Sequence, residues 1–338
     1  MSLNGCGVYL EIACYVALLF FMVPVRIQDE NNLRQLFDEY LTEFNKSYGD
    51  SSTYNRRMRH FENSLQTINF LNKNRSSRSA NYGLTKFSDM SPEEFRSQYL
   101  GQRYFDGKLI PEITENRRSA FALPEKVDWR QKRAITKIKN QNDCGACWAF
   151  AVVETVESLN AIRHGELAQL SVQQMIDCST NNYGCKGGDI CSLLSWLKSN
   201  NASVVKESEY PLVLRPHKCR WNASLPGVRI DDFVCLSLVG NENLLLTLLA
   251  TEGPVAVAVN AQTWQNYVGG VIQFHCDGEA ASLNHAVQIV GYDLSQNVPH
   301  YIVRNSWGDE FGDQGYLYIA IGNNLCGIAH EVATLSVM

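Results

Sequence analysis

One ten-residue stretch, residues 141–150, constrains this 338-residue chain more than any other. It reads Gln-Asn-Asp-Cys-Gly-Ala-Cys-Trp-Ala-Phe and joins a polar loop to a long apolar segment. Apolar residues then recur at helical spacing until His164-Gly165, so a helix is predicted to begin near Cys147. The N-terminus of a helix carries the positive end of its macrodipole, which favours the nucleophilic thiolate form of cysteine. The stretch therefore predicts a reactive thiol at a helix start.

Composition narrows the class of protein. A hydrophobic content of 45% supports a sizeable core, and the length allows two or three domains. The net charge of -5 argues against a nucleic-acid-binding protein, which usually carries a basic stripe. Nine of the eleven cysteines lie between residues 144 and 326, so at least one of these nine stays unpaired among them. Many cysteines beside one reactive thiol indicate an oxidising, secretory history.

The N-terminal residues support that history. Residues 12–23 are almost wholly apolar but too short to span a bilayer, which predicts a cleaved signal peptide over residues 1–24. A membrane anchor is the alternative, because Glu11 interrupts the apolar run and no basic segment precedes it. Four Asn-X-Ser sequons mark candidate glycosylation sites, at Asn45, Asn74, Asn201 and Asn222.

Residues 25–120 are predicted to be mostly helical. An amphipathic stripe runs from Leu33 to Phe44, and a second covers residues 53–72. Ser91-Pro92 followed by two glutamates predicts a third helix start, with serine as the N-cap. Periodicity is lost over residues 101–120, which we interpret as an extended, cleavable linker.

Within residues 121–338 the predicted secondary structure changes from mostly helical in the first half to mostly β in the second half. Helices are predicted first, at 147–164, 171–178, 189–198 and, later, 241–251. Runs rich in β-branched and aromatic residues follow, at 254–259, 285–292, 301–304 and 316–321. A helical half and an antiparallel, barrel-like sheet half that meet at a cleft predict an α+β protein.

Cleavage of a peptide by a thiol needs a base, a group that orients the base and donors for the oxyanion. His285 opens an apolar strand 138 residues after Cys147, where its ring can face the cleft. Asn305, in Asn-Ser-Trp-Gly, can accept the imidazole N–H and fix its tautomer, and Trp307 can shield that bond. The amide of Gln141, six residues before Cys147, is a candidate oxyanion donor together with the Cys147 backbone N–H.

The Cys-Gly-Ala-Cys-Trp motif, with His285 and Asn305 downstream, resembles the papain family of C1 cysteine peptidases, and within it the cathepsin O group. The resemblance implies a papain-like two-lobed fold, with a helical lobe and an antiparallel β-barrel lobe. It implies a monomeric endopeptidase without cofactor or metal, acting on protein or peptide substrates and sensitive to cystatin-type inhibitors. Its location would be the secretory pathway, in a lysosome or endosome or outside the cell. Cys147 would be the nucleophile, His285 the base and acid, Asn305 the orienting residue and Gln141 the oxyanion donor.

By the same resemblance, residues 25–120 are an inhibitory propeptide and residues 121–338 the mature peptidase. The propeptide would block the enzyme intramolecularly and open when its carboxylates are protonated in acid. Thr53 and Ser64 depart from the family pattern, where Glu and Asn are expected, and Thr85 replaces another Asn. The matching residues are Arg57, Phe61, Ile68 and Asn72 in the long helix, and Gly83, Phe87 and Asp89 after it.

The resemblance also implies a substrate pocket with Glu331 at its floor. A buried carboxylate there would let the pocket accept Arg or Lys as well as apolar side chains; the alternative is that Glu331 turns to solvent. The backbone of Gly187 and Gly188 would pair with an extended substrate. The remaining residues of this predicted pocket are Asp189, Ile190, Ala258, Leu283, Asn284, Ala286 and Trp307.

Three disulfides are implied by the matching positions, Cys144–Cys185, Cys178–Cys219 and Cys276–Cys326. Cys191 and Cys235 match no such pair. They either bond each other or remain thiols, and we favour buried thiols because Cys191 lies on a predicted helix with apolar neighbours.

Three other functions would use parts of the same pattern. Cys144 and Cys147 form the C-x-x-C of a thiol–disulfide oxidoreductase, but His285 and Asn305 would then have no role. A zinc site lacks a second cysteine pair at the required spacing. A catalytically inactive binding protein on a papain-like scaffold would be expected to lose the nucleophile or the base, and both are present here.

Overall fold

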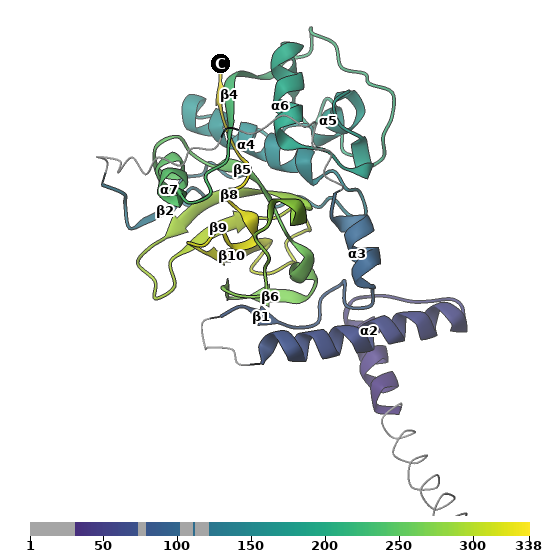
Figure 1. The fold of residues 1–338 in the computed structure, drawn as a ribbon. Helices are drawn as coiled ribbons and strands as arrows, with labels where there is room; N and C mark the ends of the chain where they lie inside the picture. The colour runs from purple at the N-terminus through teal and green to yellow at the C-terminus, as the bar shows by residue number, and fades with distance from the viewer. Residues whose placement is uncertain (1–30, 74–78, 102–110, 112–121) are drawn as a thin grey trace, which may run out of the picture.

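The computed structural model describes residues 31–73, 79–101, 111 and 122–338 (Figure 1). The predicted signal peptide, the Asn74 sequon and most of the predicted linker lie outside these residues. A helical lobe and a sheet lobe lie against each other, and an N-terminal helical region runs along one side of both (Figure 1). Within the described part of the chain, no helix is long and apolar enough to cross a membrane.

In the described residues, the N-terminal region is built from three helices. Residues 31–43 form the first, and it crosses α2 (Ser51–Asn72) through the buried rings of Phe37, Tyr40 and Phe61. The third, α3 (Pro92–Tyr99), starts as predicted. The Ser91 hydroxyl accepts from the Glu94 backbone N–H while the Glu94 carboxylate accepts from the Ser91 N–H, which satisfies two backbone donors reciprocally.

The helical lobe is organised around α4 (Cys147–His164), which ends at Gly165 in the left-handed conformation (φ 72°). Fourteen consecutive residues of this helix are buried, so it is the central helix of the lobe. Two predicted helices pack beside it, α5 (Val172–Cys178) and α6 (Ile190–Ser199), and the side chains of their N-cap residues, Ser171 and Asp189, each accept a backbone N–H. A short 3-10 turn, η1 (Gly184–Lys186), lies between them.

The sheet lobe holds the strands predicted from the β-rich runs in a mostly antiparallel sheet, as expected, but in the described residues these strands do not close into a barrel. The strands follow an open path, β3-β4-β11-β5-β8-β9-β10-β7, with β2 paired to β8. Pairing is antiparallel except for β7 with β10. The bounds are β2 (Lys126–Asp128), β3 (Ser203–Val205), β4 (Gly227–Leu236), β5 (Val255–Val259), β7 (Val271–Ile272), β8 (His285–Asp293), β9 (His300–Arg304), β10 (Tyr316–Ala320) and β11 (Val332–Val337).

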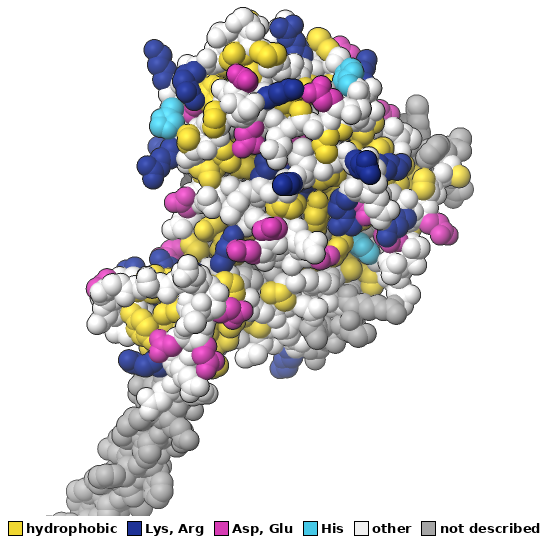
Figure 2. All heavy atoms as spheres, turned by 180° about the vertical axis from the view of Figure 1, so that it is seen from behind, with side chains coloured by type: hydrophobic (Ala, Val, Ile, Leu, Met, Phe, Trp, Pro, Cys, Tyr) yellow, Lys and Arg dark blue, Asp and Glu magenta, His cyan; other side chains and the backbone are white. Residues whose placement is uncertain are grey.

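A second, two-stranded sheet joins the N-terminal region to the sheet lobe. In it β1 (Asn81–Tyr82) pairs antiparallel with β6 (Tyr267–Gly269), so the N-terminal region adds a strand to the edge of the main domain. The remaining elements are α7 (Glu242–Thr251), η2 (Gln262–Asn266), η3 (Ala280–Ser282) and η4 (Leu325–Gly327). On the face shown in Figure 2, basic and acidic side chains are interspersed, unlike the basic stripe of a nucleic-acid-binding protein.

Four disulfides join cysteines within the described part of the chain. Three are the implied pairs, Cys144–Cys185, Cys178–Cys219 and Cys276–Cys326. The fourth joins Cys191 to Cys235, so the prediction of buried free thiols is wrong. The reason is tertiary: β4, which the sequence pattern missed, brings Cys235 alongside α6, where Cys191 lies. The sequence around Cys191 carries no trace of that contact.

Candidate active site

Cys147 is the first residue of α4, and its thiol is buried. It is the one free cysteine among the described residues. Ala146 precedes it at the N-cap and offers no side-chain hydrogen bond to the helix. Burial raises the pKa of the Cys147 thiol, while hydrogen bonds from the backbone N–H groups of Ala286 and Gly101 act in the opposite direction. In this covered state the thiol is therefore held mainly in its neutral form.

His285 is the first residue of β8, and its ring is held by Asn305. The imidazole Nε2–H donates to Asn305 Oδ1 at 2.8 Å. The Ser306 backbone N–H also donates to that oxygen, at 2.9 Å, which fixes the Asn305 amide. This leaves His285 Nδ1 as the basic nitrogen, and it has no hydrogen-bond partner among the described residues. Burial, which outweighs the Asn305 bond, lowers the pKa of His285 to about 4.

Trp307 covers this pair. Its ring centroid lies 4.8 Å from that of His285, and the indole is fully buried. The indole therefore lies over the His285–Asn305 hydrogen bond, between two residues that are themselves buried.

Gln141 is held with its amide N–H groups turned toward the catalytic region. Its Oε1 accepts from the Ser306 hydroxyl at 2.6 Å, and its Nε2 donates to the carbonyl oxygens of Cys144 (3.0 Å) and Tyr99 (3.1 Å). Because Ser306 also fixes Asn305, one serine orients both polar side chains of the site. The sequence pattern assigns no role to Ser306, and its place between Asn305 and Trp307 is the one signal that points to it.

Cys147 and His285 line the same small cavity, of about 20 Å³, which is room for about one water molecule. Most predicted pocket residues line it with them, whereas Gly187, Leu283 and Trp307 do not. Those present are Gly188, Asp189, Ile190, Ala258, Asn284, Ala286 and Glu331.

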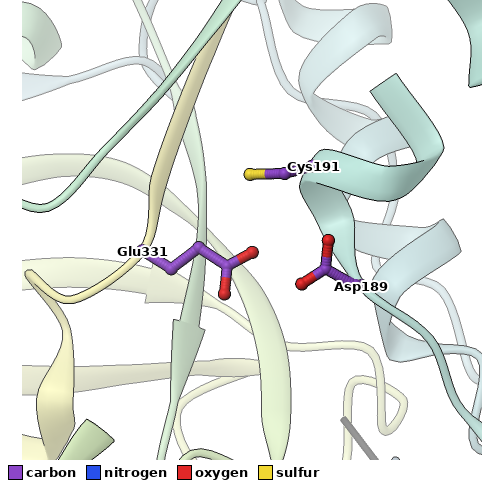
Figure 3. A group of neighbouring side chains, drawn as sticks. All are labelled: Asp189, Cys191 and Glu331. Carbon is purple, nitrogen blue, oxygen red and sulfur yellow. The ribbon is translucent and has the colours of Figure 1, made fainter. Parts of the chain in front are cut away.

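Two carboxylates meet at the floor of this cavity. Glu331 is fully buried and Asp189 nearly so, and their side chains point toward each other (Figure 3). Glu331 therefore does not turn to solvent. Ligand atoms of these two residues and of Cys191 lie within 4.8 Å of one another, but Cys191 is bonded to Cys235 and is not the thiolate that a metal binds. We assign no metal to the cluster.

The N-terminal region fills the rest of the cleft. A Cβ placed on Gly101 would lie 3.1 Å from the Cys147 sulfur and 3.2 Å from the Gly145 carbonyl oxygen, so the backbone at Gly101 passes directly over the thiol. Two residues earlier, the Tyr99 carbonyl accepts from Gln141. The covering segment thus lies over the Cys147 thiol and accepts the hydrogen bond of the candidate oxyanion donor, Gln141. Substrate is therefore excluded from both groups.

Aromatic and polar contacts dock this region on the sheet lobe. The rings of Phe87 and Phe95 meet the Trp307 indole edge-on, with centroids 5.6 and 5.4 Å away. The Lys86 ammonium donates to the Trp307 carbonyl oxygen at 2.6 Å, and Gln265 Nε2 donates to the Phe87 carbonyl at 2.9 Å. The same tryptophan that shields His285 therefore anchors the cover.

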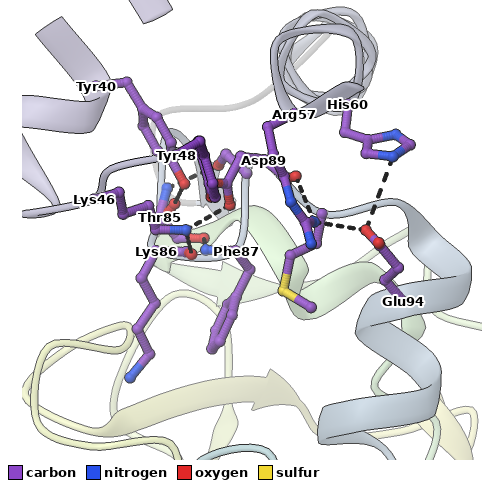
Figure 4. A network of polar contacts seen from close by, with 12 residues as sticks. Tyr40, Lys46, Tyr48, Arg57, His60, Thr85, Lys86, Phe87, Asp89 and Glu94 are labelled. Carbon is purple, nitrogen blue, oxygen red and sulfur yellow. Dashed lines mark hydrogen bonds and ion pairs between the residues drawn. The ribbon is translucent and has the colours of Figure 1, made fainter. Parts of the chain in front are cut away.

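A buried charge network shapes the docking loop (Figure 4). The Asp89 carboxylate, 1% exposed, accepts from Lys46 at 2.5 Å and from the Tyr48 hydroxyl. Arg57 donates to the Asp89 carbonyl (3.0 Å) and to the Glu94 carboxylate (2.7 Å). These bonds join α2, α3 and the loop that carries Phe87, so the motif residues of the N-terminal region form one unit.

A thiol at a helix start, an imidazole held by an amide and an N-terminal region lying over both define a cysteine peptidase with its inhibitory segment in place. Two family descriptions match: "Papain family cysteine protease" over residues 123–336 and "Cathepsin propeptide inhibitor domain (I29)" over residues 37–95. The chain belongs to the papain family of cysteine proteases.

Comparison with individual proteins gives the same family. The chain is 43% identical to mouse cathepsin O over 258 residues, which cover 76% of this chain and 82% of the relative. It is 41% identical to human cathepsin O over 283 residues, covering 82% and 87%. Among solved structures, digestive procathepsin L2 from Tenebrio molitor larval midgut matches with a TM-score of 0.81 at 30% identity, covering 90% of this chain and 99% of that one.

Proposed function

We propose that this protein is the zymogen of an endopeptidase in which Cys147, His285, Asn305 and Gln141 perform the chemistry. The observation that carries the proposal is that Cys147 and His285 line one cavity while the 2.8 Å bond to Asn305 leaves His285 Nδ1 as a base. Residues 1–24 would be the signal peptide, 25–120 the propeptide and 121–338 the mature enzyme. The reaction needs no cofactor.

In the proposed reaction the thiol proton passes to His285 Nδ1 and the Cys147 sulfur attacks the substrate carbonyl carbon. The resulting oxyanion accepts from Gln141 Nε2 and the Cys147 backbone N–H. The C–N bond breaks as the imidazolium returns its proton to the leaving amine, which leaves a thioester on Cys147. Water, deprotonated by His285, attacks this acyl-enzyme and releases the acid and the thiol. Asn305 holds one tautomer of His285 throughout.

The covered site supports intramolecular inhibition by the propeptide. With Gly101 over the thiol and Tyr99 on Gln141, substrate reaches neither group until the propeptide leaves. Removing it also returns water to the site, which relieves the burial that holds Cys147 and His285 neutral. The thiolate–imidazolium pair is therefore expected after activation and not before.

For substrate choice we propose that the pocket above Glu331 accepts Arg or Lys two residues before the cleaved bond. Support comes from the buried carboxylates of Glu331 and Asp189, which would pair with a cation. In Glu331→Gln, which keeps the volume of the pocket, cleavage of Arg substrates relative to Leu substrates should fall by about 10- to 100-fold, since a hydrogen bond to a charged group is lost. An unchanged ratio of Arg-substrate to Leu-substrate cleavage would refute this pocket assignment and would leave the peptidase proposal unaffected.

We further propose a monomer in the secretory pathway, in a lysosome or endosome or outside the cell, inhibited by cystatin-type proteins. Four disulfides support passage through an oxidising compartment. Asn45, Asn201 and Asn222 are exposed, which supports their use as glycan sites.

Hydrolysis of a fluorogenic peptide panel after acid activation tests the proposal, with Cys147→Ala as the matched variant. Cleavage that requires reductant and disappears in Cys147→Ala is the expected result. If the processed wild type cleaves nothing, the inactive binding-protein function replaces it. If full-length protein at neutral pH is already as active as acid-treated protein, the proposed inhibition is wrong.

A further inference from the structure

Arg304 is a permanently charged side chain in the interior of the protein. It is the last residue of β9, directly before Asn305, and it is 0% exposed. One terminal nitrogen, NH2, donates to the Lys137 carbonyl oxygen at 2.6 Å and to the Thr136 hydroxyl at 3.0 Å. A guanidinium cannot shed its proton, so burying it is favourable only where several acceptors converge. Its remaining partners lie on the two elements that carry Cys147 and His285.

Those partners connect three elements. Glu154 Oε1, on α4, lies 3.4 Å from Arg304 NH2. Gln288 Oε1, on β8, accepts from Arg304 NH1 at 3.4 Å, and Gln288 Nε2 donates to the Ser158 hydroxyl on α4 at 3.0 Å. Gln288 and Arg304 are directly opposed on neighbouring strands. We refer to Arg304, Glu154, Gln288 and Ser158 as the Arg304 cluster.

Each of the three elements begins at a proposed catalytic residue or ends directly before one. The helix α4 starts at Cys147, two turns before Glu154, and β8 starts at His285, three residues before Gln288. Asn305 follows Arg304 directly. A helix or a strand is rigid over a segment of three to seven residues. A displacement within the Arg304 cluster therefore moves Cys147, His285 and Asn305 by a similar distance.

We propose that the Arg304 cluster positions the reacting pair by fixing α4 against β8 and β9, and so sets the thiol of Cys147 relative to the imidazole of His285. This inference rests on the proposed function. The hydrogen bond from His285 to Asn305 fixes the orientation of the imidazole ring, but it does not connect the ring to α4, where Cys147 lies. His285 Nδ1 has no hydrogen-bond partner in the described part of the chain, so the scaffold rather than a direct bond determines its approach to the thiol.

The experiment compares acid-activated wild type with Arg304→Lys, which keeps the charge but loses the planar fork. We expect a fall in kcat on the order of 100-fold with KM unchanged, the size associated with a misplacement of about 1 Å. The pH profile of Cys147 alkylation by iodoacetamide should shift as well, because it reports the thiolate–imidazolium pair. A residue that only stabilises the fold would change neither kcat nor this profile.

Glu242→Gln is the matched control. Glu242 accepts from the Tyr301 hydroxyl, on the same strand β9, at 2.8 Å, but it belongs to α7 and is outside the Arg304 cluster. It should lower the melting temperature and leave kcat and the alkylation profile unchanged. If Arg304→Lys behaves like this control, or if both variants lose kcat equally, the positioning role is refuted.

A second variant keeps the test decisive if Arg304→Lys does not fold. Gln288→Leu is close in volume and removes both the Arg304 and the Ser158 bonds, and we expect kcat to fall about 10-fold with the same shift in the alkylation profile. An unchanged kcat and profile in this variant would overturn the inference. The proposed function fails separately, if wild type cleaves nothing or Cys147→Ala still cleaves.

Discussion

Glu154 is expected to make the stability of this protein depend on pH near neutrality. Its carboxyl is 1% exposed in the middle of α4, and burial raises its pKa to about 7. Arg304, from β9, and Lys139, from the loop before α4, oppose that rise, while Glu157 on the same helix adds to it. These are the charged groups that face Glu154, and together they leave burial as the dominant effect.

The sign and the size follow from linkage. Below pH 4.5 Glu154 is protonated in both the folded and the unfolded chain. Between pH 4.5 and 7 only the unfolded chain releases this proton, so the folded state loses stability as the pH rises through the folded pKa. The difference between an ordinary value of 4.5 and about 7 corresponds to about 3 kcal/mol, at about 1.4 kcal/mol for each pH unit.

The assay is urea unfolding of Glu154→Gln against wild type from pH 4.5 to 8.5, in a Cys147→Ala background that prevents self-digestion. At pH 4.5 the two should be nearly equal, because glutamine resembles protonated glutamate in shape, and this point is the internal control. Toward pH 8 the variant should become more stable than wild type by about 3 kcal/mol. A difference that stays flat across this range would refute the reasoning.

Three further results are expected. Gln141→Ala should lower kcat by about 10²- to 10³-fold with little change in KM in steady-state kinetics, because an oxyanion donor acts mainly in the transition state; an equal rise in KM would contradict this. Lys86→Met should weaken inhibition of mature enzyme by added propeptide by about 10- to 100-fold, since a charged donor to the Trp307 carbonyl is lost; an unchanged inhibition constant would count against that contact. Replacing Cys191 and Cys235 by alanine should cost about 2–4 kcal/mol in chemical unfolding, and no loss would show that the bond constrains little.

Local signals in the sequence predicted local structure well. Ser91-Pro92 and Ser171 mark helix starts because a hydroxyl cap and a fixed proline φ act within one turn, and both helices begin there. The helix at Cys147 and the strand at His285 also begin where their apolar periodicity predicts. The local pattern predicts these two element starts, whereas the joint role of Cys147 and His285 in one site is what the resemblance to the papain family implies.

Features that depend on distant segments escaped the sequence. The Cys191–Cys235 bond depends on the position of β4, whose mixed pattern of buried and exposed residues gives no clear period. Arg304 looks like a charged strand end that would face solvent, but acceptors from distant segments, among them the Lys137 carbonyl and Gln288, converge on its buried guanidinium. The open path of the sheet also escapes the sequence pattern, because long-range pairing sets the order of the strands.

The missing cap at the start of α4 has a consequence for how this protein balances durability against reactivity. Ala146 gives the helix no side-chain partner where serine or aspartate commonly contributes about 1 kcal/mol. Placing such a side chain there would strengthen the helix, but its oxygen would compete for the same N–H groups and put a dipole or a charge against the sulfur. A screen for variants of higher thermal stability should therefore find substitutions at Ala146 that stabilise the protein but abolish its peptidase activity. Selection for activity would therefore keep the start of α4 without a capping side chain.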